Sequence, residues 1–503
     1  MTDILKIKTL DELKKSGYKS KSIKDELRFN MIKALSDNID PFKGIFGYDE
    51  TVLPELQTSI LSRHNILLLG LRGQAKTKIA RLLINLLDEY IPAVDGSDLN
   101  EDPFVPITNE TKKLIKEHGD ETKIKWIHRS ERYTEKLATP DVTVSDLIGD
   151  VDPIKAATLK LPYSDERVIH FGSIPRSHRS IFVINELPDL QARIQVSLFN
   201  ILQESDIQIR GFKIRLPLDI QFIFTANPED YTNRGSIVTP LKDRIDSQII
   251  THYPKSIYVS QQITEQEADV SDQQKSSVVM FPLIKEIVEQ IAVEARTSEY
   301  VDEKSGVSAR LTISAYENLI SFAERRKIIN NESIAYCRVS DLIGVIPAIT
   351  GKVELVFEGE QEGSIKVANI LIGKAIKTVF EKNFPSPELM KKKKEQSPYS
   401  QITSWFSKNN IVDILSNASN QEYKKILTSI PGLQKIVDQF KPDADENLSL
   451  VFMEFILHGL SEYSQLSKLR LESGFQFKDM LSSMFTMDEI EDSDFDEEQD
   501  PFK

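Results

Sequence analysis

The first half of the chain shows short apolar runs separated by stretches of helical character. Between residues 65 and about 254 these runs and helical stretches alternate. The runs predict buried strands and the stretches predict helices, so this part is expected to form a parallel sheet covered by helices. The candidate strands are 65–69, 123–128, 181–184 and 220–225.

Other parts of the chain follow different patterns. Residues 207–216 alternate between apolar and polar positions and turn at Gly211, which predicts a β-hairpin. From residue 256 onward the pattern is helical. Helices are predicted over 281–297, 308–327, 336–349 and 367–382.

The breaks between these patterns suggest six segments. They are an N-terminal helical segment (1–40), an α/β core (41–255), a helical lid (256–350), a connecting region and linker (351–396), a helical C-terminal region (397–486) and an acidic tail expected to be disordered (487–503). The linker carries Lys391 to Lys394, and we interpret this run as solvated rather than as a nucleic-acid contact.

Composition narrows the classes of function. The chain has 503 residues and a net charge of −14, of which the stretch from Asp488 to Lys503 carries −8 through nine acids and one lysine. This balance argues against a large nucleic-acid surface, which would be basic. The single cysteine, Cys337, excludes a disulfide framework and a cysteine-based metal site. The sequence shows neither an apolar signal core nor an apolar run of 18 residues, so we expect a cytoplasmic protein without membrane contact.

The strand at 65–69 runs into a candidate phosphate-binding loop. The pattern is Gly, four residues, Gly, Lys, then Ser or Thr, and here it begins at Gly70 and ends with Lys76 and Thr77. Ala75 stands where the last glycine is expected. The candidate nucleotide-binding residues are Gly70, Leu71, Arg72, Gly73, Gln74, Ala75, Lys76 and Thr77. The alternative is a glycine-containing turn before an ordinary helix, but the strand before the loop and the helical pattern after it favour a nucleotide site.

Backbone N–H groups of such a loop cradle phosphates, the lysine neutralises the terminal phosphates, and the Thr77 hydroxyl is a ligand for Mg²⁺. ATP and Mg²⁺ are therefore the expected cofactors.

The strand at 181–184 leads to Asn185 and Glu186, where the second half of such a site is expected. Glu186 is the candidate base for an attacking water, and both residues are candidate Mg²⁺ neighbours. Asn185 stands where an aspartate is usual and adds no charge, so we expect weaker Mg²⁺ binding than in a site with Asp. The alternative for the pair is a helix cap after a strand. Asn227, which follows the strand at 220–225, is placed to reach the γ-phosphate or the water.

Two arginines are candidates for contact with the nucleotide. Arg244 lies in an apolar-edged helical sequence and is a candidate arginine finger for a neighbouring subunit. Its alternative is a surface salt bridge with Asp243 or Asp246. Arg310 begins a predicted helix, and its alternative is an ordinary arginine at a helix start.

Five motifs in order resemble the AAA+ ATPases, and within them the branch of the magnesium-chelatase ATPase subunit and MoxR. They are GLRGQAKT (70–77), IFVINE (181–186), TANP (225–228), LKDR (241–244) and SARL (308–311), and the resemblance covers roughly 41–350. It implies a P-loop AAA+ core with a parallel sheet covered by helices, then a helical lid and a helical C-terminal region.

The resemblance also implies roles for single residues. Gly70 to Thr77 correspond to Walker A, Asn185 and Glu186 to Walker B, Asn227 to sensor 1, Arg244 to the arginine finger and Arg310 to sensor 2. Residues 140–180 are similar to the segment with the helix-2 insertion, and 207–216 to the pre-sensor-1 hairpin. The departures from the family pattern are Asn185 and Ala75, of which this branch tolerates the second.

The family implies an ATP-hydrolysing ring, commonly a hexamer, that remodels or activates a partner protein, such as one with a von Willebrand A module. The sequence itself lacks the Asp-x-Ser-x-Ser motif of that module. Three alternatives stay open: the ATPase subunit of a true magnesium or cobalt chelatase, a transcription-activator ATPase, and a nucleotide-binding scaffold with little turnover. A transcription-activator ATPase would carry a GAFTGA-type loop and a DNA-binding helix-turn-helix, and the sequence shows neither.

Overall fold

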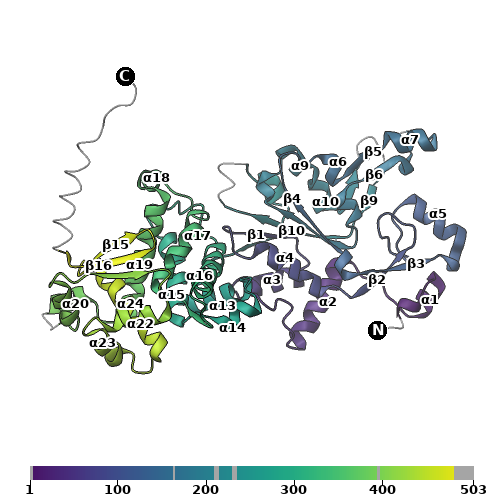
Figure 1. Cartoon of the computed structure of the whole chain (residues 1–503). Coiled ribbons are helices and arrows are strands. Elements are labelled where there is room, and N and C mark those ends of the chain that lie inside the picture. Colours follow the sequence, from purple (N-terminus) through teal and green to yellow (C-terminus); the bar gives the residue numbers. More distant parts are fainter. Residues whose placement is uncertain (1–3, 163–164, 209–214, 229–234, 394–396, 481–503) are drawn as a thin grey trace, which may run out of the picture. The chain divides into compact units, whose positions relative to one another are not determined.

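A computed structural model describes residues 4–162, 165–208, 215–228, 235–393 and 397–480 (Figure 1). The chain folds into two compact units, Met1–Tyr253 and Pro254–Lys503. The predicted acidic tail, 487–503, and the tip of the predicted hairpin, 209–214, lie outside the described residues. The finer six-segment division remains a prediction.

The first unit is built on a five-stranded parallel sheet, of which β1, β4 and β10 are labelled in Figure 1. The order of the strands is β11-β1-β10-β7-β4. Numbered along the chain within this sheet, the order is fifth, first, fourth, third and second. The predicted α/β class, with a parallel sheet accompanied by many helices, is confirmed. The strands of the sheet are β1 (Ile66–Leu69), β4 (Tyr133–Leu137), β7 (Ser180–Asn185), β10 (Ile220–Ala226) and β11 (Ser247–Ile250).

Burial on both faces explains why the central strands are mostly apolar. Successive side chains of a strand point to opposite faces. Phe182 and Ile184 of β7 accordingly belong to one apolar cluster, and Ile181 and Val183 to another. All seven residues of β10 are buried. A parallel sheet covered on both faces requires such strands.

The sheet corrects three expectations. The predicted strand 123–128 exists as β3 (Ile124–His128), but it pairs antiparallel with β2 (Tyr90–Val94) outside the parallel sheet. Strands β4 and β11 were not predicted. Both are edge strands with partly exposed residues, so their sequences, Tyr-Thr-Glu-Lys-Leu and Ser-Gln-Ile-Ile, lack the long apolar run of a central strand.

The first unit also contains helices and two short antiparallel strand pairs that follow β4 and α10 (Phe199–Glu204) in the chain. The helices are α1 (Leu10–Lys15), α2 (Ile23–Ser36), α3 (Val52–Leu61), α4 (Lys76–Leu82), α5 (Asn109–His118), α6 (Val144–Leu147), α7 (Pro153–Leu159), α8 (Ser173–Arg176), α9 (Ala192–Ser197), α10 (Phe199–Glu204) and α12 (Thr239–Lys242). Strands β5 (Gly149–Val151) and β6 (Ile169–Phe171) pair antiparallel and flank α7, within the segment that resembles the helix-2 insertion. Strands β8 (Asp206–Gln208) and β9 (Arg215–Pro217) pair antiparallel where the hairpin was predicted.

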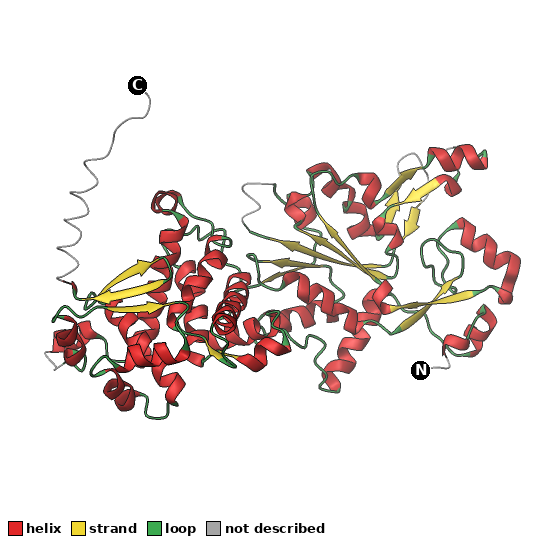
Figure 2. Cartoon of the chain, in the orientation of Figure 1, coloured by secondary structure: helices red, strands yellow, loops and turns green. Residues whose placement is uncertain are grey.

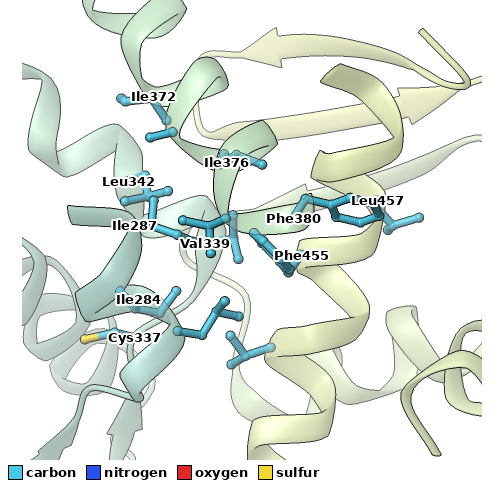
Figure 3. Packing of buried hydrophobic residues seen from close by; sticks show 14 of the residues in the cluster. Ile284, Ile287, Cys337, Val339, Leu342, Ile372, Ile376, Phe380, Phe455 and Leu457 are labelled. Atoms are coloured by element: carbon cyan, nitrogen blue, oxygen red, sulfur yellow. The ribbon is translucent and has the colours of Figure 1, made fainter. Parts of the chain in front are cut away.

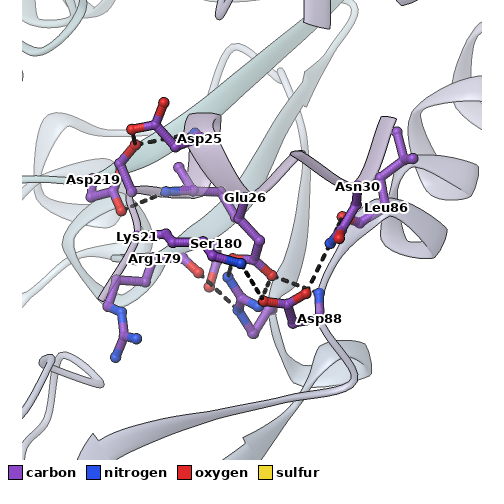
Figure 4. A network of polar contacts seen from close by, with 12 residues as sticks. Lys21, Asp25, Glu26, Asn30, Leu86, Asp88, Arg179, Ser180 and Asp219 are labelled. Carbon is purple, nitrogen blue, oxygen red and sulfur yellow. Dashed lines mark hydrogen bonds and ion pairs between the residues drawn. The ribbon is translucent and has the colours of Figure 1, made fainter. Parts of the chain in front are cut away.

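Residues 4–40 belong to the first unit and are joined to it by a buried polar network (Figure 4). The carboxylate of Glu26 in α2 accepts two hydrogen bonds from Arg132, at 2.7 and 2.6 Å, and both side chains are almost completely buried. The N–H group of Ile23, at the start of α2, donates to Asp219 at 2.8 Å. A buried ion pair is favourable only when its groups are hydrogen-bonded, as they are here.

The second unit is mostly helical (Figure 2). Its helices are α13 (Ile257–Glu267), α14 (Asp272–Ser277), α15 (Pro282–Arg296), α16 (Arg310–Ile329), α17 (Ile346–Thr350), α18 (Phe357–Glu362), α19 (Ser364–Asn383), α20 (Pro387–Lys393), α21 (Ser400–Phe406), α22 (Asn420–Thr428), α23 (Leu433–Phe440) and α24 (Glu446–Glu462). Its strands are β12 (Val278–Val279), β13 (Ala335–Tyr336), β14 (Val412–Leu415), β15 (Ser467–Leu471) and β16 (Gly474–Lys478).

A single apolar cluster connects the helices of the second unit (Figure 3). Ile287 of α15, Phe380 of α19 and Phe455 of α24 all contribute to it. The predicted helix 367–382 is therefore the buried α19. The predicted helix 336–349 is instead a short strand, a 3-10 helix (Val339–Val345) and α17.

The C-terminal region is not helical throughout, because β14, β16 and β15 form a three-stranded antiparallel sheet that was not predicted. Among the residues that the structure describes, none of the helices combines the length and apolar character needed to cross a membrane.

Candidate nucleotide-binding site

The loop at 70–77 begins where β1 ends. Gly70 still belongs to the sheet edge, since its N–H group donates to the carbonyl of Ala226 at 3.1 Å. A Cβ atom at Gly70 would lie 2.0 Å from the Thr251 hydroxyl oxygen and 2.3 Å from Oε1 of Gln74. The hydroxyl of Thr251 donates to that same Oε1 at 2.7 Å. The first position of the motif therefore accepts only glycine, because the neighbouring polar groups occupy the space of a side chain.

The loop curls around its own lysine. Lys76 opens α4 and is 8% exposed, and its Nζ donates to the carbonyls of Gly70 and, at 3.0 Å, of Leu71. An ammonium group has three donors and no acceptor, so it can exchange carbonyl oxygens for phosphate oxygens of the same hydrogen-bonding character. The geometry thus places a positive charge at the centre of the loop.

Ala75 connects the loop to α4 in the left-handed backbone conformation, with φ 58° and ψ 14°. Glycine adopts this conformation at little cost, whereas a Cβ atom crowds the carbonyl that follows it. Ala75 therefore has a backbone conformation that favours glycine, and the strain of its Cβ atom destabilises the loop.

Two tyrosines that no sequence motif singled out hold the outside of the loop. The hydroxyl of Tyr48 lies 3.0 Å from the carbonyl oxygen of Gln74 and 2.8 Å from that of His252, so it can donate to either. Burial raises the pKa of Tyr48 to about 12, which keeps it a donor. The hydroxyl of Tyr253 donates to the carbonyl of Arg72 at 3.1 Å. No local pattern marks these residues, because they act on backbone carbonyls.

Asn185, at the end of β7, has both ends of its amide in hydrogen bonds. Its Nδ2 donates to Oε1 of Glu135 at 2.6 Å, and its Oδ1 accepts from the Thr225 hydroxyl at 3.0 Å. Asn185 is buried. These contacts fix the side chain in one orientation, with the N–H₂ group toward β4 and the carbonyl toward β10.

Glu186 follows β7, and Asn227 follows β10, the neighbour of β1 in the sheet. Glu186 is half-buried and has a positive φ of 54°, and its N–H group lies 3.2 Å from the Thr225 hydroxyl oxygen. Non-glycine residues with positive φ are concentrated at functional sites. Asn227 follows the last residue of β10 and is 1% exposed.

The strand register brings these groups to one edge of the sheet. Leu69 of β1 pairs with Ala226 of β10, and Phe224 of β10 pairs with Ile184 of β7. Neighbouring strands lie about 4.8 Å apart, so the backbones that lead to the loop and to Asn185 are separated by roughly 10 Å. Ligands of open α/β sheets bind at the carboxyl ends of the strands. The arrangement is therefore suited to a phosphate chain that lies across the ends of β1, β10 and β7.

The structure gives Arg244 partners outside the loop and places Arg310 in the second unit. The guanidinium group of Arg244 donates to Gln203 at 3.1 Å and to the carbonyl of Pro240 at 2.7 Å, and it stacks 4.9 Å from the ring centre of Phe199. Asp246, one of the predicted alternative partners, accepts instead from the N–H group of Asn65 at 2.8 Å. Arg310 is exposed at the start of α16 in the second unit.

The chemistry of the donor set fits Mg²⁺. The Thr77 hydroxyl, the Asn185 carbonyl and the Glu186 carboxylate all offer hard oxygen atoms, which this cation prefers. Within the described ranges, three or more His, Cys, Asp or Glu side chains do not gather in any metal-binding arrangement.

Comparisons with known proteins gave structural likenesses only. No protein-family model matches the sequence, and no curated protein matches it. Several solved structures overlap part of the chain. One is NtrX from Brucella abortus, with 13% identity and a TM-score of 0.31 over 58% of this chain, which spans only 55% of the NtrX chain.

Two other solved structures overlap the chain to a similar extent. One is the complex between subunits BchI and BchD of magnesium chelatase, with 17% identity and a TM-score of 0.33 over 64% of this chain and 98% of that chain. The other is a RuvB variant from Thermotoga maritima, with 10% identity and a TM-score of 0.33 over 76% of this chain and 95% of that chain. Overlaps of this extent do not define a function. The functional assignment is therefore based on the strand order and on the loop of this chain.

Proposed function

We propose that this protein is an ATP-hydrolysing AAA+ motor of the MoxR and magnesium-chelatase type, which assembles as a ring and remodels or activates a partner protein. The observation that carries this proposal is the convergence of the lysine-filled loop, Asn185 with Glu186, and Asn227 at the ends of three adjacent parallel strands. The ordered motifs of the sequence support the same assignment.

In this proposal each residue has a distinct task. Lys76 leaves the carbonyls of its loop and neutralises the terminal phosphates. Glu186 accepts a proton from the attacking water or polarises it, and Asn227 orients that water. Mg²⁺, when bound with the nucleotide, would neutralise phosphate charge, and Thr77 and Asn185 would hold it. Arg244 would be supplied to the site of the neighbouring subunit and Arg310 would act from the lid. The partner, such as a protein with a von Willebrand A module, would be moved by the relative motion of the lid and the core.

Substitution of the proposed base tests the assignment. Glu186→Gln keeps the shape of the side chain but removes its basicity, so ATP binding should persist while hydrolysis falls by about 10²–10⁴-fold. Lys76→Ala should lose nucleotide binding as well. A fluorescent nucleotide measures binding and released phosphate measures turnover. Undiminished turnover in Glu186→Gln would remove Glu186 from this role.

A nucleotide-binding scaffold with little turnover is the second candidate, and Asn185 favours it because the residue adds no charge at the Walker B position. The same assay distinguishes the two candidates. The motor requires turnover by the assembled wild-type protein, whereas the scaffold requires binding with turnover no faster than that of Glu186→Gln.

A further inference from the structure

Asn185 lacks the negative charge expected at its position, yet a carboxylate lies directly beside it. Glu135 of β4 accepts the hydrogen bond of the Asn185 amide at 2.6 Å. Strand β4 is the neighbour of β7 in the sheet, and Leu137 is the register partner of Asn185. Glu135 therefore lies two residues before the end of β4, at the same edge of the sheet as the candidate site. Its side chain is 23% exposed.

We propose that Glu135 provides the negative charge that an aspartate at position 185 would otherwise supply, and that Glu135 and Asn185 act as one singly charged pair toward the divalent cation that accompanies the nucleotide. This inference rests on the proposed nucleotide-binding function. Glu135 is a positioning residue in this account, because it acts through Asn185 and through its field rather than by contact with the reacting atoms.

Three hydrogen-bonding contacts hold the Glu135 carboxylate in one orientation. Arg81 donates to Oε2 at 2.9 Å and to Oε1 at 3.2 Å, and the Tyr133 hydroxyl lies 3.3 Å from Oε2. Arg81 follows Thr77 by four residues in α4, so both lie on the same face of that helix. The network thus connects the helix that carries Thr77 with the strand that carries Glu135.

Arg81 does not cancel the charge of Glu135. The Arg81 side chain is 62% exposed, so water screens its charge although its two hydrogen bonds with Glu135 are bidentate. The charge of Glu135 therefore remains available to a cation that binds nearby.

The pair also explains why an amide is present at position 185. An aspartate there would place a second carboxylate 2.6 Å from Glu135 without a proton between them, and like charges at this distance oppose ionisation of both. An amide next to a carboxylate carries one charge and one hydrogen bond. The double substitution Glu135→Gln/Asn185→Asp exchanges the two groups and again gives one negative charge and one hydrogen bond.

The charge exchange is the experiment that tests the inference. The readout is the affinity for a fluorescent ATP analogue in EDTA and across a Mg²⁺ titration, together with Mn²⁺ binding followed by electron paramagnetic resonance. Glu135→Gln should leave binding in EDTA intact but weaken the Mg²⁺-dependent gain in affinity by about tenfold, since one charge near the cation is lost. The double variant should return the gain to within about threefold of the wild type.

Glu131→Gln is the matched control, because this exposed carboxylate precedes the same strand and should change neither readout. An unchanged Mg²⁺ dependence in Glu135→Gln would overturn the inference and leave the proposed function intact. Failure of the wild type to bind nucleotide at all would overturn both.

The double variant remains decisive even if Glu135→Gln alone does not fold. The inference requires that the Mg²⁺-dependent gain in affinity of the double variant match that of the wild type. The opposite result would be a double variant that binds Mg²⁺ more than about tenfold more tightly than the wild type does. In that case Glu135 would contribute no charge in the wild type, and the introduced aspartate would act alone.

Discussion

Ala75 shows how a single residue can keep the geometry of a motif while departing from its sequence. Its left-handed backbone is that of the glycine it replaces, and a non-glycine residue in this conformation costs about 1–2 kcal/mol. Gly70, in contrast, cannot be replaced, because Thr251 and Gln74 fill the space of a Cβ atom. The two glycine positions of the motif are therefore needed for different reasons, backbone conformation at one and space at the other.

The cost at Ala75 can be measured. Ala75→Gly should raise the free energy of unfolding of the first unit by about 0.5–1 kcal/mol. The substitution removes the strain of a Cβ atom in the left-handed conformation, and this effect exceeds the larger conformational entropy that glycine has in the unfolded chain. Urea unfolding followed by circular dichroism measures this. Ala80→Gly, a buried position within α4, is the control and should lose about 1 kcal/mol or more. A loss of stability in Ala75→Gly would contradict the argument.

Among the elements, α2 shows how the N-terminal residues become part of the first unit. Its first N–H group donates to the carboxylate of Asp219, and its Glu26 forms the buried ion pair with Arg132 (Figure 4). Burial raises the pKa of Asp219 to about 6, although the nearby Arg179 and Arg132 oppose this. The anchor of α2 is therefore a carboxyl group whose charged form is disfavoured by its surroundings.

This anchor predicts a pH dependence. The pKa of Asp219 in the folded protein lies above its ordinary value of 3.8. The neutral carboxyl group therefore contributes fully to the free energy of unfolding below pH 3.8, and this contribution is lost as the pH rises through about 6. Asp219→Asn keeps an acceptor for Ile23 but cannot ionise. Relative to the wild type, the variant should gain stability between pH 4 and 7, by up to about 3 kcal/mol.

Thermal unfolding across pH 4–8 measures this gain. Asp25→Asn on the same helix is a control of opposite sign, because its hydrogen bonds with Arg63 and Ser22 lower the pKa of Asp25. The Asp25→Asn variant should lose rather than gain stability as the pH rises. A pH-independent difference between Asp219→Asn and the wild type would contradict the proposed titration of Asp219.

At the scale of the whole molecule, the proposed ring makes each site depend on a second copy of the chain. The side-chain contacts of Arg244 described by the structure are with Gln203, Pro240 and Phe199. In the proposed ring, Arg244 would instead contact the nucleotide of a neighbouring copy. Assembly would then control hydrolysis, because an arginine finger accelerates the reaction by about 10³–10⁵-fold.

Mixed assemblies test this dependence. Arg244→Ala should bind ATP as the wild type does but hydrolyse it at least about 10³-fold more slowly. Added Glu186→Gln subunits, which retain Arg244, should restore part of the activity. Lys242→Ala, an exposed position at the end of α12 and two residues before Arg244, should behave as the wild type. If mixing restored no activity although the subunits assembled, Arg244 would not act across an interface.

Much of the core could be predicted from the sequence because central strands leave an unambiguous signal. The strands β1, β7 and β10 are buried on both faces and therefore appear as mostly apolar runs, in which Gln221 and Thr225 of β10 are polar exceptions. The edge strands β4 and β11 are partly exposed and carry polar residues, so local pattern did not identify them. The sheet of β14, β15 and β16 was missed for the same reason, since its strands mix apolar and polar positions.

The loop, its lysine and the polar residues that end the central strands follow from the sequence alone, because motif spacing and strand burial are properties of short segments. Which groups meet depends on the tertiary structure. It placed Glu135, from a strand with no apolar signal, 2.6 Å from Asn185, and it put the carbonyls of Gly70 and Leu71 on the ammonium of Lys76. These contacts join residues through strand order and loop curvature, which no local pattern encodes. The missing charge at position 185 was therefore visible in the sequence, and the neighbouring carboxylate became visible only in the fold.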